Sequence, residues 1–295
     1  MPTSPAESTI AGLCPAAAAP MLELTAAELE PPHTEVVGLG LRLCAVAHEQ
    51  LLLAGKHLAA DVEGLHTGIH QARKSIRRVR AILALGMRRL DPRAQRLDAD
   101  LAQLCRGMSR LRDAQALIEA LHRLNDNAPD DVCAILPEAE TAARQRRDEL
   151  LAQALKRDPQ FLSRRRRLQS MSDRLLRLNW QPLGDAEAVA AILRSERRVE
   201  KASRRAKRHP DRHEDWHVLR RRKRRLRQQD TVLARVCPEV RTRMPGLENQ
   251  ADALGHAQDD TLVVMQCGRT SPFSREHRTL LRRIARERLQ YARRN

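Results

Sequence analysis

Two stretches of the sequence combine a histidine with cationic side chains at helical spacing. The first contains His70, Arg73, Lys74, Arg77, Arg78 and Arg80, and the second, 147 residues further on, contains His217, Arg220, Arg221, Arg224 and Arg227. Residues three and four positions apart lie on one face of a helix, so each stretch predicts a cationic stripe. A guanidinium group donates paired hydrogen bonds to phosphate oxygens and keeps its charge, which favours a phosphate-rich ligand.

The charge along both stripes is uniform in sign. No acidic residue interrupts residues 70–90 or 216–229. Like charges at i,i+4 repel by about 0.2–0.5 kcal/mol per pair, so the arrangement costs stability in each copy. A helix face that only contacts water gives no reason for the same destabilising arrangement to occur in two copies. We therefore interpret the stripes as one site in which an anionic ligand is held between two halves.

The histidines and two later aspartates are candidates for supporting roles. Neighbouring cations should favour the neutral form of an imidazole, so His70 and His217 are expected to bind ligand or orient arginines rather than catalyse. Asp113, preceded by Arg112, follows the first stripe, and Asp259 follows the second at nearly the same distance. These aspartates are expected to pair with arginines or cap backbone groups. With Arg78 and Arg112 they would support the site, and we expect no metal and no cofactor.

The composition indicates the kind of partner. The 295 residues include 54 Lys and Arg against 37 Asp and Glu, a net charge of +17, which favours polyanions or anionic surfaces. Only two Trp, two Phe and one Tyr are present. Proteins that bind single-stranded nucleic acid usually stack bases on aromatic side chains, so this scarcity weakens that alternative.

The cysteines and the hydropathy pattern indicate a cytoplasmic location. The six cysteines form no C-x-x-C pair and are interpreted as free, mostly buried thiols in a reducing compartment. No apolar run is long enough to span a bilayer, and the N-terminus does not resemble a signal peptide. We therefore expect no membrane association; the oligomeric state is left open.

The pattern of apolar residues predicts an all-α fold. Leu and Ala recur at three- and four-residue spacing from residue 35 onward, and no segment alternates with period two. Residues 1–33 are rich in Ala, Pro, Ser and Thr and are expected to be a disordered leader. Pro, Gly and Asn breaks delimit expected helices at 35–60, 65–90, 93–124, 131–156, 160–179, 185–209, 213–236, 240–268 and 275–294.

A shift of 147 residues superimposes the first four expected helices on the last four. The helix at 160–179 is then a connection between a first repeat, about 34–156, and a second, about 183–295. We predict two pseudo-symmetric antiparallel four-helix bundles from an internal duplication, with a basic central groove, forming one domain over 34–295.

The two stripes resemble the motifs of the conserved histidine α-helical domain, the CHAD family. The first follows the pattern His-x-x-Arg-x-x-x-Arg-Arg-x-Arg, and the second follows His-x-x-Arg with basic residues four and seven positions later. Ser109-Arg-Leu-Arg-Asp113 and Leu254-Gly-His-Ala-Gln-Asp259 are similar to the two motifs expected further along. Ser109 stands where the family usually has Gly, and Gln228 where Tyr is common. The resemblance implies a paired helical bundle whose basic groove binds inorganic polyphosphate without catalysis, associated with polyphosphate granules.

Three other functions were weighed against this interpretation. The first is a zinc hydrolase, because His213-Glu214-Asp-Trp-His217 matches the pattern H-E-x-x-H, which can hold zinc beside a general base. This motif leads into a densely cationic helix, which disfavours a dication. The second is a phosphatase or polyphosphate kinase. Phosphoryl transfer usually needs carboxylate-bound Mg²⁺, an activated nucleophile or a glycine-rich phosphate loop, and the sequence shows none of these. Nonspecific binding of RNA or DNA through phosphates is the main alternative.

Overall fold

The computed structural model describes residues 37–126 and 128–294, and within these ranges the chain is all-α, with no strand. The all-α prediction is confirmed. The expected leader, residues 1–33, lies outside the described residues. No described helix is long and apolar enough to cross a membrane. The cysteines of the described ranges have free thiols, and all but Cys133 are buried.

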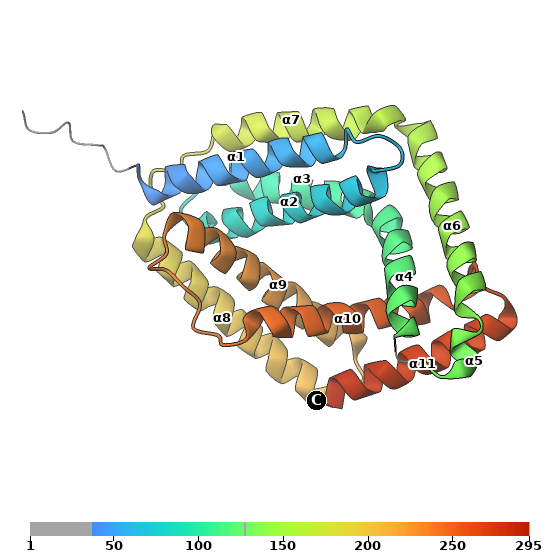
Figure 1. Cartoon of the computed structure of the whole chain (residues 1–295). Helices are drawn as coiled ribbons and strands as arrows, with labels where there is room; N and C mark the ends of the chain where they lie inside the picture. The colour runs from blue at the N-terminus through green and yellow to red at the C-terminus, as the bar shows by residue number, and fades with distance from the viewer. Residues whose placement is uncertain (1–36, 127, 295) are drawn as a thin grey trace, which may run out of the picture. The chain divides into compact units, whose positions relative to one another are not determined.

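The helices follow the sequence breaks, with three exceptions. Their bounds are α1 (Leu39–His57), α2 (Leu65–Gly86), α3 (Arg93–Gly107), α4 (Ser109–Asn125), α5 (Asp130–Cys133), α6 (Leu136–Arg157), the 3-10 turn η1 (Pro159–Phe161), α7 (Leu162–Leu176), α8 (Asp185–Arg208), α9 (His213–Val236), α10 (Leu247–Gln266) and α11 (Arg275–Arg294). The helix expected at 160–179 is α7, which packs along α1 (Figure 1).

Three expected helices are corrected by the structure. The helix expected at 131–156 is two helices, α5 and α6, because a turn at Ala134 and Ile135 separates them. The single helix expected at 93–124 is two helices, because Met108 (φ −108°, ψ 5°) leaves the helical conformation between α3 and α4. The helix expected at 240–268 begins only at Leu247. Pro245 and Gly246 precede it, and Gly246 adopts the left-handed region (φ 62°), which interrupts a helix. The break at Met108 matters most, because α3 packs in one hydrophobic cluster whereas most buried residues of α4, from Ala116 on, pack in the other.

The buried side chains form two hydrophobic clusters, and each cluster takes helices from both sequence halves. One is built mainly from α1, α2, α3, α7, α8 and α9, with single residues of α4, α6 and α10, and the other is built from α4, α5, α6, α10 and α11. In Figure 1 the blue α1 and the cyan α2 accordingly lie near the orange α9, and the green α4 lies near α10. The two groups of helices therefore do not coincide with the two proposed repeats, and the internal duplication stays a prediction.

The helices that carry the stripes are held by the first cluster. Ile76, Val79 and Ile82 of α2 are fully buried, and burial of an aliphatic side chain contributes about 1.5–3 kcal/mol. Gly68 lets α2 approach α1 closely, since a Cβ atom there would lie 2.2 Å from the carbonyl oxygen of His57. With its apolar side fixed against α1, α2 presents the opposite side, and the stripe on it, away from that core.

A buried hydrogen bond joins α2 to α9. Nε2 of Gln229, a residue with no exposed surface, donates to the carbonyl oxygen of Ala81 at 3.2 Å. Ala81 directly follows Arg80 and Gln229 closely follows Arg227, so the bond aligns the ends of the two stripes. The sequence-distant stripes are thus set side by side by core packing and by this contact.

Candidate anion-binding groove

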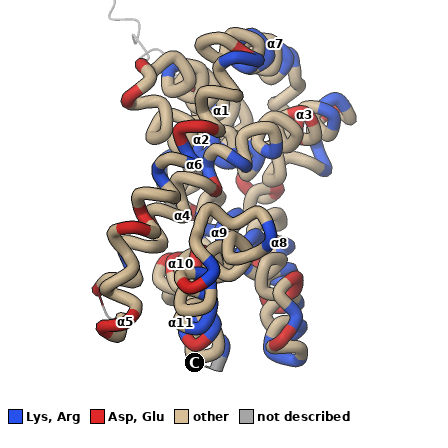
Figure 2. The backbone as a smooth tube through the Cα atoms, turned by 90° about the vertical axis from the view of Figure 1, so that its right-hand side faces the viewer, with Lys and Arg blue, Asp and Glu red and all other residues tan. Residues whose placement is uncertain are grey.

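A groove with a volume of about 2690 Å³ runs between α2, α3, α4, α9 and α10 and extends to α8 and α11. Most of the side chains that we predicted for the site line it: His70, Arg73, Arg77, Arg80, Arg112, Asp113, His217, Arg220, Arg221, Arg224, Arg227 and Asp259. Figure 2 shows α9 among the segments richest in Lys and Arg. The groove thus brings together residues from two segments far apart in the sequence.

Two predicted residues lie outside the groove lining. Lys74 is exposed, and Arg78 turns toward α1, where its Nη1 donates to Oε1 of Gln50 at 3.1 Å. The groove-facing side of α2 is centred near Arg73 and Arg77. At 100° per residue, Lys74 and Arg78 lie on the other side of His70, progressively further from that centre. The prediction placed the stripe too symmetrically around His70.

On α2, the outer arginines of the stripe are held by polar partners. Arg73 donates through Nη1 to the carbonyl oxygen of Cys105 and to the Ser109 hydroxyl, the latter at 3.3 Å. Arg80 forms a bidentate ion pair with Asp98 of α3, with N–O distances of 2.8 and 3.0 Å. These contacts use donors that would otherwise face the groove.

The histidine of this stripe is set back into the protein. His70 is partly buried, and burial together with the positive charges of Arg112 and Arg77 lowers its pKa. Its neutral form is therefore favoured at neutral pH, as the sequence predicted. A neutral imidazole can still donate one hydrogen bond to a phosphate oxygen.

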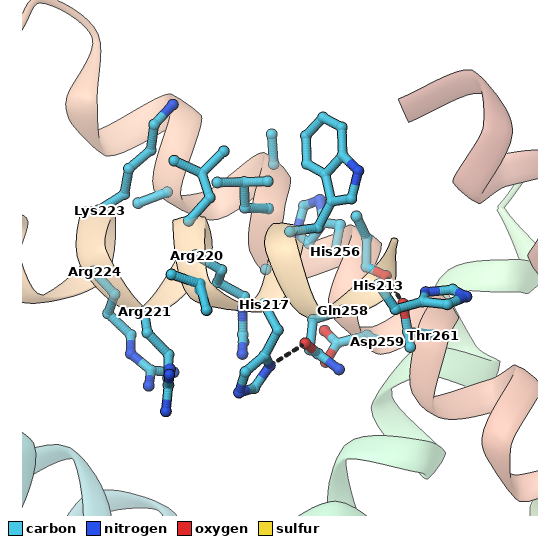
Figure 3. A pocket seen from close by; sticks show the side chains of 18 of the residues that line it. His213, His217, Arg220, Arg221, Lys223, Arg224, His256, Gln258, Asp259 and Thr261 are labelled. Atoms are coloured by element: carbon cyan, nitrogen blue, oxygen red, sulfur yellow. Dashed lines mark hydrogen bonds between the residues drawn. The ribbon is translucent and has the colours of Figure 1, made fainter. Parts of the chain in front are cut away.

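On α9, the stripe projects to one side of the helix. Figure 3 shows the side chains of His217, Arg220, Arg221 and Arg224 extending to the same side, whereas Lys223 extends away from them. His217 is exposed, and its Nδ1 is hydrogen-bonded to Oε1 of Gln258 at 3.0 Å. Gln258 is a contact that the sequence analysis missed, although it directly precedes Asp259.

At its far end, the α9 stripe is neutralised by acids of α10. Arg227 forms ion pairs with Glu248 and with Asp252, the second at 2.6 Å. This matches the Arg80–Asp98 pair at the end of the α2 stripe. Both stripes therefore end in an arginine whose charge is already compensated.

The middle of the groove has no such compensation. Among the described residues, no carboxylate lies within 4 Å of Arg77 or Arg224. Burial and the neighbouring Arg73 lower the pKa of Arg77 to about 10, and burial with repulsion from Arg77 and Arg220 lowers the pKa of Arg224 to about 8. Nε of Arg77 is buried and has no hydrogen-bond partner in the described part of the chain. Both groups remain charged at pH 7, and their repulsion would be relieved by an anion.

The two aspartates lie among the arginines of the groove. Burial raises the pKa of both Asp113 and Asp259, while adjacent arginines act in the opposite direction. Asp259 accepts a hydrogen bond from Arg123 of α4 at 2.6 Å, which joins α10 to α4. The expected pairing with arginine is thus found for Asp259. Arg112 and Arg220 lie near both carboxylates, which places the two aspartates at one end of the stripes.

The H-E-x-x-H histidines have separate hydrogen-bond partners. His213 interacts through Nδ1 with Nη2 of Arg293 at 2.6 Å, whereas His217 is bonded to Gln258. Within the described ranges, no group of three or more His, Cys, Asp or Glu side chains is placed to hold a metal ion. The two imidazoles are therefore positioned by α11 and α10 respectively and do not converge on one point.

The fold and the groove define an all-helical protein with a cationic site made from two sequence-distant helices. The sequence matches the CHAD domain over residues 45–265, and the chain belongs to this family. Comparison with curated proteins gave no significant match. Among solved structures, the chain is similar to PptA from Streptomyces chartreusis, with a TM-score of 0.55 and 19% sequence identity. That similarity covers 88% of this chain and 100% of PptA, and it concerns the fold.

Proposed function

We propose that this protein binds inorganic polyphosphate in the groove between α2 and α9, without catalysing a reaction on it. The observation that carries the proposal is the uncompensated pair Arg77 and Arg224 in the middle of the groove, whose pKa values are lowered by burial and by repulsion from neighbouring arginines. Membership of the CHAD family supports polyphosphate as the anion.

The chemistry of polyphosphate fits these groups. The polymer carries about one negative charge per phosphate and has no base or sugar to be recognised, so charge and hydrogen-bond donors are all that a site can offer it. Guanidinium groups on rigid helices supply both, and they bind two phosphate oxygens at once. His70, Arg73, Arg220 and Arg221 flank the central pair and would contact adjacent phosphates.

The polar groups of the groove favour binding over catalysis. Phosphoryl transfer normally depends on carboxylates that hold Mg²⁺ or on an activated nucleophile. Asp113 and Asp259 are surrounded by arginines, which compete with a metal ion for their oxygens. The proposed role is therefore that of a receptor, and association with polyphosphate granules would follow from several such contacts per chain.

Nonspecific nucleic-acid binding is the second candidate function. Trp216 and Tyr291, the aromatic side chains of the described residues that are not buried, both line the groove, and Tyr291 is 74% exposed. Aromatic side chains beside cations can stack bases of a single strand. RNA would then contact the α11 end of the groove as well as the arginines.

Calorimetric titration distinguishes the two functions. Long-chain polyphosphate and RNA of equal total charge are titrated separately into the full chain at two salt concentrations. Polyphosphate is expected to bind more tightly than RNA, with an affinity that falls steeply as salt increases because counterions are released. Equal or tighter binding of RNA would replace the polyphosphate proposal with the nucleic-acid one, and turnover of polyphosphate during the titration would contradict the noncatalytic role.

A further inference from the structure

A second group of arginines lies outside the groove lining. It consists of Arg88 in the turn after α2, Arg194 and Arg198 on α8, and Arg222 and Arg225 on α9, and we refer to these five residues as the outer cluster. In the described ranges, no carboxylate lies within 4 Å of any of them. The outer cluster is therefore a second uncompensated cationic surface, formed by three helical segments.

Helix packing brings the outer cluster together. α8 and α9 form a hairpin, and Arg198 and Arg222 lie about ten residues to either side of its connecting turn, so they stand at similar heights. Arg194 precedes Arg198 by one helical turn and shares its face. The Arg89–Glu187 ion pair, at 3.0 Å, fixes the end of α2 against the start of α8 and thereby places Arg88 near Arg194.

The electrostatic influence of these arginines on one another agrees with that placement. Burial and the charge of Arg88 lower the pKa of Arg194. Burial and the charge of Arg198 lower the pKa of Arg222. Arg194 and Arg222 are thus repelled by arginines of neighbouring segments, whereas the largest effect of a charge on Arg225 comes from Asp98, which acts to raise its pKa.

The outer cluster begins where the groove ends. Arg221 lines the groove and adjoins Arg222, whose pKa it lowers further. Arg225 lies beside the Arg80–Asp98 ion pair, and Arg80 also lines the groove. A chain-like anion leaving the groove beside Arg221 and Arg80 would therefore meet the outer cluster next.

The geometry points to a second polyphosphate-binding site at the outer cluster, which takes the part of a long chain that extends beyond the groove and runs over α8. This inference rests on the proposed function and adds a chain-length preference to it. The stripe from His217 to Arg227 is about 15 Å long, at 1.5 Å per residue, so short oligomers are accommodated by the groove alone. A long chain engages both sites, and the second contact is intramolecular, which raises the affinity.

The test compares two double variants of the full chain. Arg194→Ala with Arg198→Ala removes two outer-cluster charges, and Arg197→Ala with Lys201→Ala removes two exposed charges from the same helix at the same spacing. Alanine favours the helical state, so both variants should fold, which circular dichroism verifies. Each protein is titrated with long-chain polyphosphate and with tripolyphosphate, which is too short to occupy the middle of the groove and the outer cluster at the same time.

The expected result is a loss confined to one protein and one ligand. Arg194→Ala/Arg198→Ala should bind long chains about tenfold more weakly, and its salt dependence, d log K/d log [salt], should decrease in magnitude by about 1.4, the value for two phosphate contacts. Its affinity for tripolyphosphate and both affinities of the control variant should stay near those of the unsubstituted protein.

Two other results would be informative in different ways. Unchanged affinity for long chains in Arg194→Ala/Arg198→Ala, or an equal loss in the control, would overturn the second site and leave the groove intact. If the unsubstituted protein bound neither ligand in a salt-dependent way, the proposed function itself would be wrong, and the outer cluster would have no role in it.

Discussion

The end and the middle of the groove differ in how their arginines are compensated. At the end, Arg80 is paired with Asp98, and Arg227 with Glu248 and Asp252. In the middle, Arg77 and Arg224 have no carboxylate nearby within the described residues. The protein thus neutralises its own charges at the end, where they stabilise the fold. In the middle they stay uncompensated, at a cost in stability, which is the arrangement that the proposed anion site requires.

The largest effect should come from reversing charge in the middle. Arg77→Glu with Arg224→Glu places two carboxylates among Arg73 and Arg220, so a polyanion is repelled and affinity for polyphosphate should fall at least about 100-fold. Calorimetry measures the affinity, and circular dichroism should show unchanged helical content.

A matched control separates this local effect from net charge. Lys156→Glu with Arg157→Glu makes the same charge change at exposed positions near the end of α6, outside the groove lining. Its affinity should decrease only slightly, through the lower net charge. Retention of near-native affinity by Arg77→Glu/Arg224→Glu would mean that the middle of the groove is not the binding site.

The second prediction is that single substitutions in the middle and at the end of the groove change the free energy of unfolding in opposite directions. Arg224→Met removes an uncompensated charge, so the free energy of unfolding should rise by about 1–3 kcal/mol while affinity falls about tenfold. Arg80→Met leaves the partly buried Asp98 without its partner, so its free energy of unfolding should fall by about 1–2 kcal/mol. Denaturant unfolding measures both. A loss of stability in Arg224→Met would contradict the difference between middle and end.

The third prediction concerns pH. The pKa of His70 is lowered in the free protein, and a bound polyanion would favour the charged imidazole and raise that pKa. Binding therefore takes up a proton: affinity should increase as pH falls from 7 toward 6, and this gain is lost as pH rises through the pKa of the complex. One group gives at most about tenfold per pKa unit, so a change of a few-fold is expected.

Two variants test whether His70 is the source of this pH dependence. His70→Gln should bind with a flatter pH profile, measured by calorimetry at pH 6 and pH 7. His57→Gln, at the end of α1 and outside the groove lining, should keep the profile of the unsubstituted protein. An unaltered profile in His70→Gln would assign the proton to another group.

The smallest effect is expected at the compensated end. Arg227→Gln removes a charge already paired with Glu248 and Asp252, so affinity for long-chain polyphosphate should fall only about two- to threefold, far less than for Arg224→Met. The same titrations at two salt concentrations measure it. A loss as large as that of Arg224→Met would show that the acids of α10 release Arg227 when ligand binds.

The helical class, most of the helix positions and the two stripes were predictable from the sequence because they depend on spacing within single segments. The acidic side chains that neutralise the outer arginines were not predictable. Asp98 and Asp252 lie on helices other than those of Arg80 and Arg227, and nothing in their local sequence marks them as partners. The break at Met108 was missed for a similar reason. The apolar period continues through it, and only tertiary packing places α3 in one cluster and most of α4 in the other.

The composition of the outer cluster also depends on how helices pack and could not be predicted from the sequence. Arg197–Arg198 and Arg204–Arg205 are visible as basic runs, but the sequence does not tell which of them faces α9. The hairpin of α8 and α9 determines that Arg198 lies near Arg222. Conversely, Lys74 and Arg78 match the spacing of the stripe and still lie outside the groove lining, because the neighbouring helices decide where the face of α2 is centred.

The buried bond from Gln229 to Ala81 has a consequence for binding kinetics. α2 and α9 share one hydrophobic cluster and are joined by this bond, so the two walls of the groove cannot separate without exposing apolar side chains. The site is therefore preorganised, and little conformational entropy is lost when ligand enters. Association should be fast and electrostatically steered, and a long chain can exchange by successive release and rebinding of its segments, with no opening of the protein as a rate-limiting step.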